Sequence, residues 1–188
     1  MKRTLLNFIA FQAGWFALVL GAAYGQPWPG MLLAGLAIAM HLALSERPSQ
    51  EVRLIVVALS AGLVCDSLLA ASGWLRYASP APGLAPYWIL AMWALFATTL
   101  NVSMRWLKGR TGLAALMGAV FGPLSYIAGQ RLGALEFIDF QAAVPALAIA
   151  WALAMPLLML AATRFDGIRG QDSRVPRRQF SEEVTAGD

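Results

Sequence analysis

The sequence predicts an all-α polytopic membrane protein with six transmembrane helices and both termini in the cytoplasm. Three observations predict this class. Of the 188 residues, 59% are hydrophobic; the apolar residues form six long runs; and most of the Lys and Arg residues lie on one side of the implied zigzag. Only 13% of the residues are charged, whereas about a quarter are charged in a soluble domain.

Each apolar run is close to the length that a spanning helix needs, which is about 20 residues for a hydrocarbon core roughly 30 Å thick. The predicted helices cover residues 4–23, 28–44, 54–75, 84–107, 112–132 and 142–162. Together they form one membrane domain over residues 1–163 and leave no room for a soluble one. The charged segment 164–188 lacks an apolar period, so we expect a mobile cytoplasmic tail.

The first run resembles a signal peptide, but it is longer than a usual signal core and carries Asn7 and Gln12, so we interpret it as the first span. The runs are separated by turn-forming residues at 24–27, 45–51, 79–83 and 109–111. These short connections give an up-and-down bundle in which successive helices cross in opposite directions.

The distribution of basic residues predicts the orientation. Twelve lie on the side of the N-terminus: Lys2, Arg3, Arg47, Arg53, Arg105, Lys108, Arg110, Arg164, Arg169, Arg174, Arg177 and Arg178. Only Arg76 and Arg131 lie opposite. Because basic residues resist translocation, both termini are expected in the cytoplasm. Six aromatic residues are expected at the outer interface: Tyr24, Trp28, Trp74, Tyr77, Tyr87 and Trp88.

Asp66 is the leading candidate for a functional residue because it lies near the middle of the third predicted span. A carboxyl group at that depth costs roughly 2.5 to 3.5 kcal/mol on insertion scales, so it should face the protein interior and be partnered. Two roles fit: a titrating functional group, or a hydrogen-bonded group that locks two helices. By depth, the expected partners are Ser125 and Tyr126 in the fifth span.

The fifth span also carries a stripe of small residues. Its expected helix-packing residues are Gly118, Gly122, Pro123, Gly129 and Gly133. Such glycines let helix backbones approach closely, and a proline inside a helix leaves one carbonyl without its N–H partner, which favours a kink. The stripe therefore predicts either tight packing or a break that opens a pocket.

Further polar and aromatic residues inside the spans are candidates for lining such a pocket. An inner polar layer contains Asn7, Gln12, His41, Thr98 and Asn101, which can bridge helices. Trp15, Trp93 and Trp151 lie well inside their spans, facing either lipid or an apolar cavity. Arg131 either snorkels to the outer interface or reaches towards Asp66. The expected substrate-binding residues are Asp66, Ser125, Tyr126, Gln12, Asn101, Arg131 and Trp15.

The composition argues against several function classes. One histidine and one cysteine supply neither a haem ligand pair nor a metal cluster, and no glycine-rich phosphate loop is present, so we expect no metal and no cofactor. The basic residues lie at helix ends and in the tail, where topology accounts for them, so nucleic acid is not an expected partner. Whether the protein is an enzyme stays open.

Four segments resemble a family of small proteobacterial integral membrane proteins classed only as a domain of unknown function. They are Phe11-Gln12-Ala13-Gly14-Trp15, Cys65-Asp66-Ser67, the run from Leu95 to Leu107, and Gly118 to Leu135 (GAVFGPLSYIAGQRLGAL). The resemblance covers nearly all six predicted helices and implies a single domain in the bacterial inner membrane. It implies no activity, although the family's association with lipid-modifying enzymes of the cyclopropane synthase type favours membrane lipid as substrate or partner.

The sequence therefore leaves three functional hypotheses. The first is a protein that handles a lipid or small hydrophobic molecule in a pocket near Asp66 and the fifth span. The second is a non-catalytic accessory subunit or scaffold that binds a membrane protein partner. The third is a small proton-coupled transporter in which Asp66 titrates.

Overall fold

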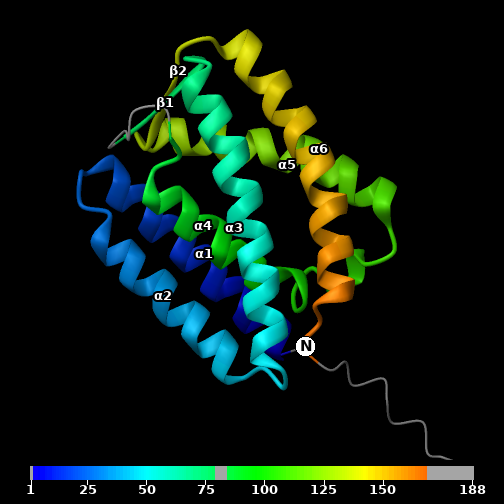
Figure 1. Cartoon of the computed structure of the whole chain (residues 1–188). Helices are drawn as coiled ribbons and strands as arrows, with labels where there is room; N and C mark the ends of the chain where they lie inside the picture. Colours follow the sequence, from blue (N-terminus) through cyan, green and yellow to red (C-terminus); the bar gives the residue numbers. More distant parts are fainter. Residues whose placement is uncertain (1, 79–83, 169–188) are drawn as a thin grey trace, which may run out of the picture.

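The computed structural model describes residues 2–78 and 84–168 and consists of six helices and two short strands (Figure 1). In chain order these are α1 (Lys2–Ala23), α2 (Trp28–Ala43), α3 (Pro48–Ala71), β1 (Leu75–Tyr77), α4 (Tyr87–Leu100), the 3-10 turn η1 (Arg105–Leu107), α5 (Thr111–Arg131), β2 (Leu135–Phe137) and α6 (Phe140–Arg164). The predicted all-helical class is confirmed. The expected turn at 79–83 and most of the expected mobile tail lie outside the described residues.

Four of the helices, α1, α3, α5 and α6, are long and apolar enough to cross a membrane. The other two are apolar but shorter: α2 has 16 residues and α4 has 14. At ~1.5 Å per residue, α4 is roughly 21 Å long, less than the thickness of a hydrocarbon core.

Helix α4 occupies the centre of the bundle. Nine of its 14 residues are buried, including Trp88, Trp93 and Leu100, and α1, α2, α3 and α6 all pack against it. A helix that is hydrophobic on every side is expected to be buried. The other five helices each carry exposed large apolar side chains, among them Leu6, Leu36, Val64, Leu116 and Leu153. Such apolar surface on five helices suits a hydrocarbon environment.

Two helix boundaries differ from the prediction. Helix α3 begins at Pro48 and not near 54, because a proline is well suited to the first helical position, where its missing N–H is not needed. Helix α4 ends at Leu100 and not near 107: the chain turns and then forms η1. Glu51, placed in a loop from the sequence, therefore lies in the first turn of α3.

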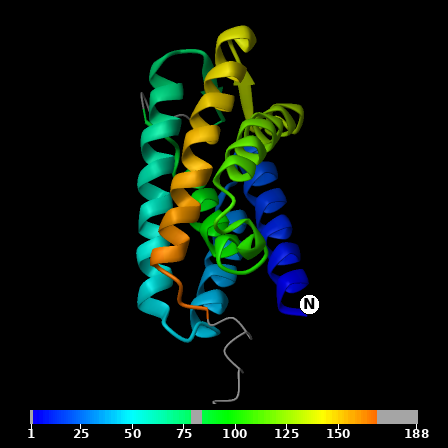
Figure 2. The same cartoon turned by 90° about the vertical axis from the view of Figure 1, so that its right-hand side faces the viewer.

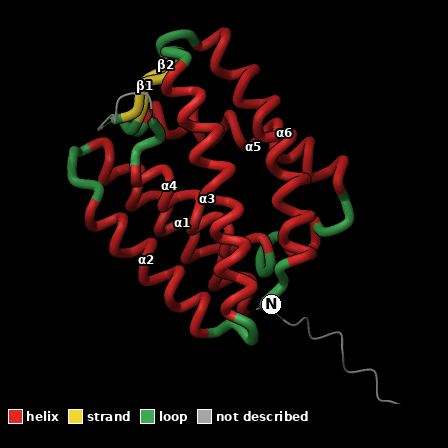
Figure 3. Tube along the Cα trace, in the orientation of Figure 1, coloured by secondary structure: helices red, strands yellow, loops and turns green. Residues whose placement is uncertain are grey.

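The two strands were not predicted. They form an antiparallel pair at the end of the bundle away from the N-terminus (Figure 3), with Arg76 opposite Glu136. The side chains of this pair form an exposed salt bridge of 3.2 Å. Three-residue strands leave no periodic pattern, so sequence alone could not reveal them.

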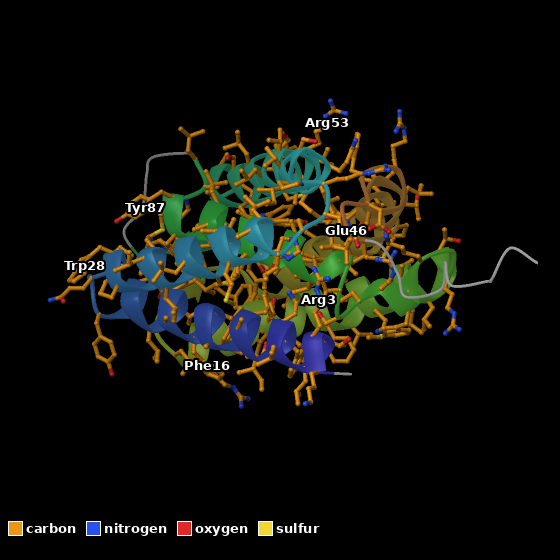
Figure 4. The ribbon with its side chains drawn as sticks, turned by 90° about the horizontal axis from the view of Figure 1, so that it is seen from below. Arg3, Phe16, Trp28, Glu46, Arg53 and Tyr87 are labelled. Atoms are coloured by element: carbon orange, nitrogen blue, oxygen red, sulfur yellow. The ribbon has the colours of Figure 1, made fainter. Side chains whose placement is uncertain are left out.

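The first and last described residues lie at one end of the molecule (Figure 1). There the guanidinium group of Arg3 donates to the Leu44 carbonyl, and the backbone N–H of Arg47 donates to the Gly167 carbonyl. Helices α3 and α6 lie side by side (Figure 2); α3 begins at this end and α6 finishes there. Trp28 and Tyr87 lie at the other end, well separated from Arg3 (Figure 4).

Candidate functional site

A cavity of about 480 Å³ lies between α1, α4, α5 and α6. Its wall is almost entirely apolar or aromatic and contains no Asp, Glu, Lys, Arg or His side chain among the described residues. Three wall residues also have strongly exposed side chains: Phe8 (52%), Phe121 (56%) and Leu124 (49%). Because Phe8 belongs to α1 and the other two to α5, the cavity reaches the molecular surface between these helices.

A row of aromatic rings crosses the cavity wall. Phe11 on α1 contacts Phe96 on α4, with ring centroids 5.9 Å apart. Phe96 meets Trp151 on α6 edge to face at 5.6 Å, and Trp151 stacks on Trp93 at 4.7 Å. Offset stacking and edge-to-face contacts are the favoured geometries of aromatic pairs. The row thus fixes the relative positions of three helices around the cavity.

Asp66 lies directly behind this wall and is fully buried. Its carboxylate accepts hydrogen bonds from Tyr77 and Tyr126, both at 2.5 Å to Oδ1, and from the indole of Trp93 at 2.6 Å to Oδ2. Tyr126 and Trp93 line the cavity, whereas Asp66 does not. The side chains of Tyr126 and Trp93 therefore separate the Asp66 carboxylate from the cavity.

Asp66 lies in the second half of α3. Since α3 begins at Pro48 and ends at Ala71, Asp66 lies roughly 27 Å along the helix at ~1.5 Å per residue, about 10 Å past its middle and about 8 Å from the end that leads to the strands. That position explains why Tyr77 of β1 can reach it. Tyr77 (3% exposed) and Trp88 (1%) belong to the core and not to the outer interface as predicted. Tyr24, Trp28, Trp74 and Tyr87 are exposed.

Two of the predicted packing glycines lie against α6. A Cβ atom added at Gly118 would meet the Trp151 carbonyl oxygen at 2.2 Å, and one at Gly122 would meet the Trp151 ring at 2.3 Å. These glycines allow the Trp151 indole to enter the bundle. Gly129 instead faces Leu135, and Gly133 has a φ of 85° in the turn before β2, a conformation that favours glycine.

Helix α5 continues through Pro123 without interruption from Thr111 to Arg131. The hydroxyl of Ser125 donates to the carbonyl of Gly122, so it satisfies a group of its own helix and does not contact Asp66. Pro123, which cannot donate to the carbonyl four residues back, thus does not break α5.

The structure brings some of the predicted site residues together and separates others. Gln12, Trp15, Ser125 and Tyr126 line the cavity, and Asp66 lies one hydrogen bond behind it. Arg131 is exposed and does not reach Asp66, whose donors among the described residues are the uncharged Tyr77, Tyr126 and Trp93. Asn101 is fully buried in a separate polar cluster near the chain ends.

That second cluster is centred on Glu51, which sequence reasoning missed. Glu51 is 1% exposed, and its Oε2 lies 2.8 Å from His41 Nε2. Its Oε1 accepts hydrogen bonds from Asn101 and from the backbone N–H of Gly167. Asn101 also donates to the carbonyl of Phe165. Glu51 and Asn101 thus bind the segment that follows α6. In the sequence, Pro48 is a helix-start signal and could have indicated that Glu51 is helical.

A network of charges continues this attachment at Asp166. Arg105 and Lys108 form salt bridges to its carboxylate of 2.7 and 2.8 Å. Burial raises the pKa of Asp166, but hydrogen bonds from Lys108 and the Ile168 backbone outweigh this, so its pKa lies below the ordinary 3.8. Burial lowers the pKa of Lys108, and the contact with Asp166 opposes the shift. The start of the expected mobile tail is therefore held in place as far as Ile168.

Fold and cavity together define an all-helical protein whose apolar helices suit a membrane. The chain belongs to the family described as "Protein of unknown function (DUF2878)", whose family model matches residues 4–157. No curated protein and no solved structure shows a match. The matched range includes the whole cavity wall and Asp66 but ends before the Phe165–Ile168 segment.

Proposed function

We propose that this protein spans the bacterial inner membrane six times and binds a lipid or another small hydrophobic molecule in the aromatic cavity. The observation that carries the proposal is the position of the cavity, which reaches the surface between α1 and α5 beside Phe8, Phe121 and Leu124. An opening flanked by exposed apolar side chains faces acyl chains when the helices span a bilayer. Its volume of about 480 Å³ falls in the ~300–1,000 Å³ range of small-molecule sites.

The arrangement of the chain ends supports the six-span topology with cytoplasmic termini. Arg3, Arg105 and Lys108 lie at the end where Gly167 is bound, and Arg76 lies at the opposite end with the strands. This division follows the positive-inside rule. The shortness of α4 is compatible with spanning because its C-terminal end, at Leu100 and Asn101, is fully buried in protein, where irregular backbone is tolerated at membrane depth.

The proposal is tested by identifying what co-purifies with the protein. Native mass spectrometry in mild detergent, followed by extraction and lipid analysis, should find a hydrophobic molecule bound to the wild type. Ser125→Phe and Met117→Trp place larger side chains in the cavity wall and should reduce its occupancy at least fivefold. The matched control is Leu116→Phe on the same helix, because Leu116 is 60% exposed and does not line the cavity.

Equal occupancy in the filling variants and the control would place the bound molecule elsewhere and contradict the proposal. A purified stoichiometric complex with another membrane protein, with no small molecule bound to either, would favour the accessory-subunit hypothesis. Unfolding temperatures of the variants in the same detergent separate lost binding from lost folding.

A second candidate function rests on Asp66. This carboxylate is fully buried and, among the described residues, accepts hydrogen bonds from three uncharged donors, two of which line the cavity. Ionisable groups inside membrane bundles often mark ion or substrate paths. A proton-coupled transporter would show pH-dependent flux in vesicles that Asp66→Asn abolishes. Flux that persists in this variant would exclude a titrating role for Asp66.

A further inference from the structure

One face of α1 forms the side of the cavity opposite α5. It contributes Phe8, Phe11, Gln12, Trp15 and Val19, whose spacing of three and four residues keeps them on one helical face. Gln12 is the only member of this face with a carboxamide, and Trp15 lies one turn further along. At this spacing both polar groups can meet the same bound molecule.

Most other polar groups of the cavity wall are satisfied within the protein. Trp93 and Tyr126 donate to Asp66, Trp88 donates to the Ala78 carbonyl, Thr99 to Phe96 and Ser125 to Gly122. Gln12 differs. Within residues 2–78 and 84–168, neither its carboxamide nor the indole N–H of Trp15 has a hydrogen-bond partner. The Ser103 hydroxyl is likewise unpaired there, but the backbone N–H of Ser103 donates to Asn7, which lies more than one turn before Gln12 on α1. The Trp151 indole also lines the cavity, but it adjoins the hydroxyl of Tyr126.

An unpaired carboxamide is unusual in such surroundings. Gln12 and Trp15 are partly buried in the cavity wall. A polar group that loses water without gaining a partner destabilises a protein by roughly 1–3 kcal/mol, and a cavity that opens towards acyl chains supplies little water to compensate. The carboxamide of Gln12 offers both a donor and an acceptor, and the indole of Trp15 offers a donor only. A ligand oxygen between them would satisfy both donors.

The cavity wall also restricts the charge of its ligand. None of its described lining residues is charged, so a phosphate, carboxylate or ammonium group would be taken from water without a counter-charge. That transfer is far more costly than the burial of a neutral carbonyl or hydroxyl.

We propose that the cavity binds an uncharged hydrophobic molecule with a carbonyl or hydroxyl oxygen, which is held by the Gln12 carboxamide and the Trp15 indole N–H. This inference rests on the proposed function and specifies its ligand. Esters, ketones, quinones and long-chain alcohols belong to the class, and a headgroup-bearing lipid belongs to it only if its charged group stays outside the cavity.

Tryptophan fluorescence tests the inference directly, since four of the seven tryptophans line the cavity and bromine atoms quench nearby indoles. The probes are the dibrominated forms of stearic acid methyl ester, stearyl alcohol, octadecane and stearate, titrated into full-length protein in detergent micelles. Wild-type protein should bind the ester and the alcohol about tenfold more tightly than octadecane, as two hydrogen bonds allow. Stearate at a pH where it is ionised should bind no more tightly than octadecane.

Gln12→Leu keeps every tryptophan and the approximate size of the side chain. It should remove the preference, so that the ester and the alcohol bind no more tightly than octadecane. Trp15→Phe, read against its own unquenched signal, should weaken ester binding about threefold to fivefold. The matched control is Gln141→Leu, because Gln141 is an exposed glutamine at the start of α6 that does not line the cavity; it should keep the wild-type preference.

The outcomes distinguish the two proposals. If no probe quenches the wild type, the cavity binds no hydrophobic molecule and the proposed function fails with the inference. If all four probes bind equally, or if Gln12→Leu retains the preference for the ester, the cavity still binds hydrophobic molecules but the inference is overturned. Tight stearate binding would overturn the requirement for an uncharged ligand.

Discussion

The hydroxyl of Tyr126 on α5 donates a hydrogen bond to the carboxylate of Asp66 on α3, across 60 residues of sequence. These two helices have few other direct connections, since α5 packs mainly on α6 and α3 packs mainly on α4. The bond therefore links the helix pair α5 and α6 to the rest of the bundle at the cavity wall. It makes both folding and cavity shape sensitive to one carboxylate.

Tyr126→Phe should destabilise the protein by about 1–3 kcal/mol, because it removes one of three buried hydrogen bonds to a carboxylate that has no alternative donor nearby. The measurement is the unfolding temperature in a mild detergent. Ser125→Ala is the control: its hydroxyl bonds only to the carbonyl of Gly122 on the same helix, so its effect should be much smaller. Equal effects would contradict the importance of the link to α3.

Asp66→Asn should also be destabilising. An amide oxygen can accept the two tyrosine hydroxyls that share Oδ1, but the amide nitrogen would face the indole N–H of Trp93. Two donors cannot bond to each other. In a double-mutant cycle, Asp66→Asn and Trp93→Phe should be non-additive, because Trp93→Phe removes the indole N–H that the amide nitrogen would face; additive losses would mean that the two side chains act independently.

Gly122→Ala should destabilise the bundle by about 1–3 kcal/mol, since even a methyl group would overlap the Trp151 ring. The matched control is Gly35→Ala in α2, where an added Cβ meets nothing within 4 Å. That control should be neutral or stabilise by up to ~1 kcal/mol through helix propensity. A Gly122→Ala protein as stable as the control would show that α5 and α6 can separate without loss.

The salt bridges at Asp166 predict a dependence of stability on pH. Because the folded-state pKa of this group lies below 3.8, its contribution is fully present above the unfolded-state pKa and is lost as the pH falls through the folded-state pKa. Asp166→Asn should therefore lower the unfolding temperature at pH 6 and lose this difference as the pH is lowered below about 4. A difference that stays constant down to pH 3 would exclude the salt bridges as its cause.

Site-directed labelling checks the topology. In a Cys65→Ala background, Glu136→Cys beside the strand pair should react with a membrane-impermeant maleimide on the periplasmic side. Arg110→Cys, which precedes α5 at the opposite end, should react only after lysis. Both residues are exposed, so burial does not account for a difference. Reaction of Arg110→Cys in intact cells would contradict cytoplasmic placement of that end.

Much of the helical architecture could be predicted because long apolar runs and short turns determine it locally. The start of α3 at Pro48 and the end of α4 at Leu100 could not be predicted in this way. The first depends on the geometry of a helix start, and the second depends on tertiary packing. The proximity of Asp66 and Tyr126 could be predicted from the positions of these two residues along their apolar runs. Tyr77, by contrast, reaches Asp66 only because a three-residue strand pair places it there, and a pairing so short leaves no signal in the sequence.

The three partners of Asp66 are unequally distant along the chain. Tyr77 and Trp93 follow it by 11 and 27 residues, whereas Tyr126 follows by 60. During synthesis on the ribosome, α3 and α4 emerge well before α5, β2 and α6. The carboxylate can therefore find the Trp93 indole before the segments that place Tyr77 and Tyr126 have left the ribosome. Truncated nascent chains that end after α4 should already bury Asp66, and the cavity then closes as the last step of assembly.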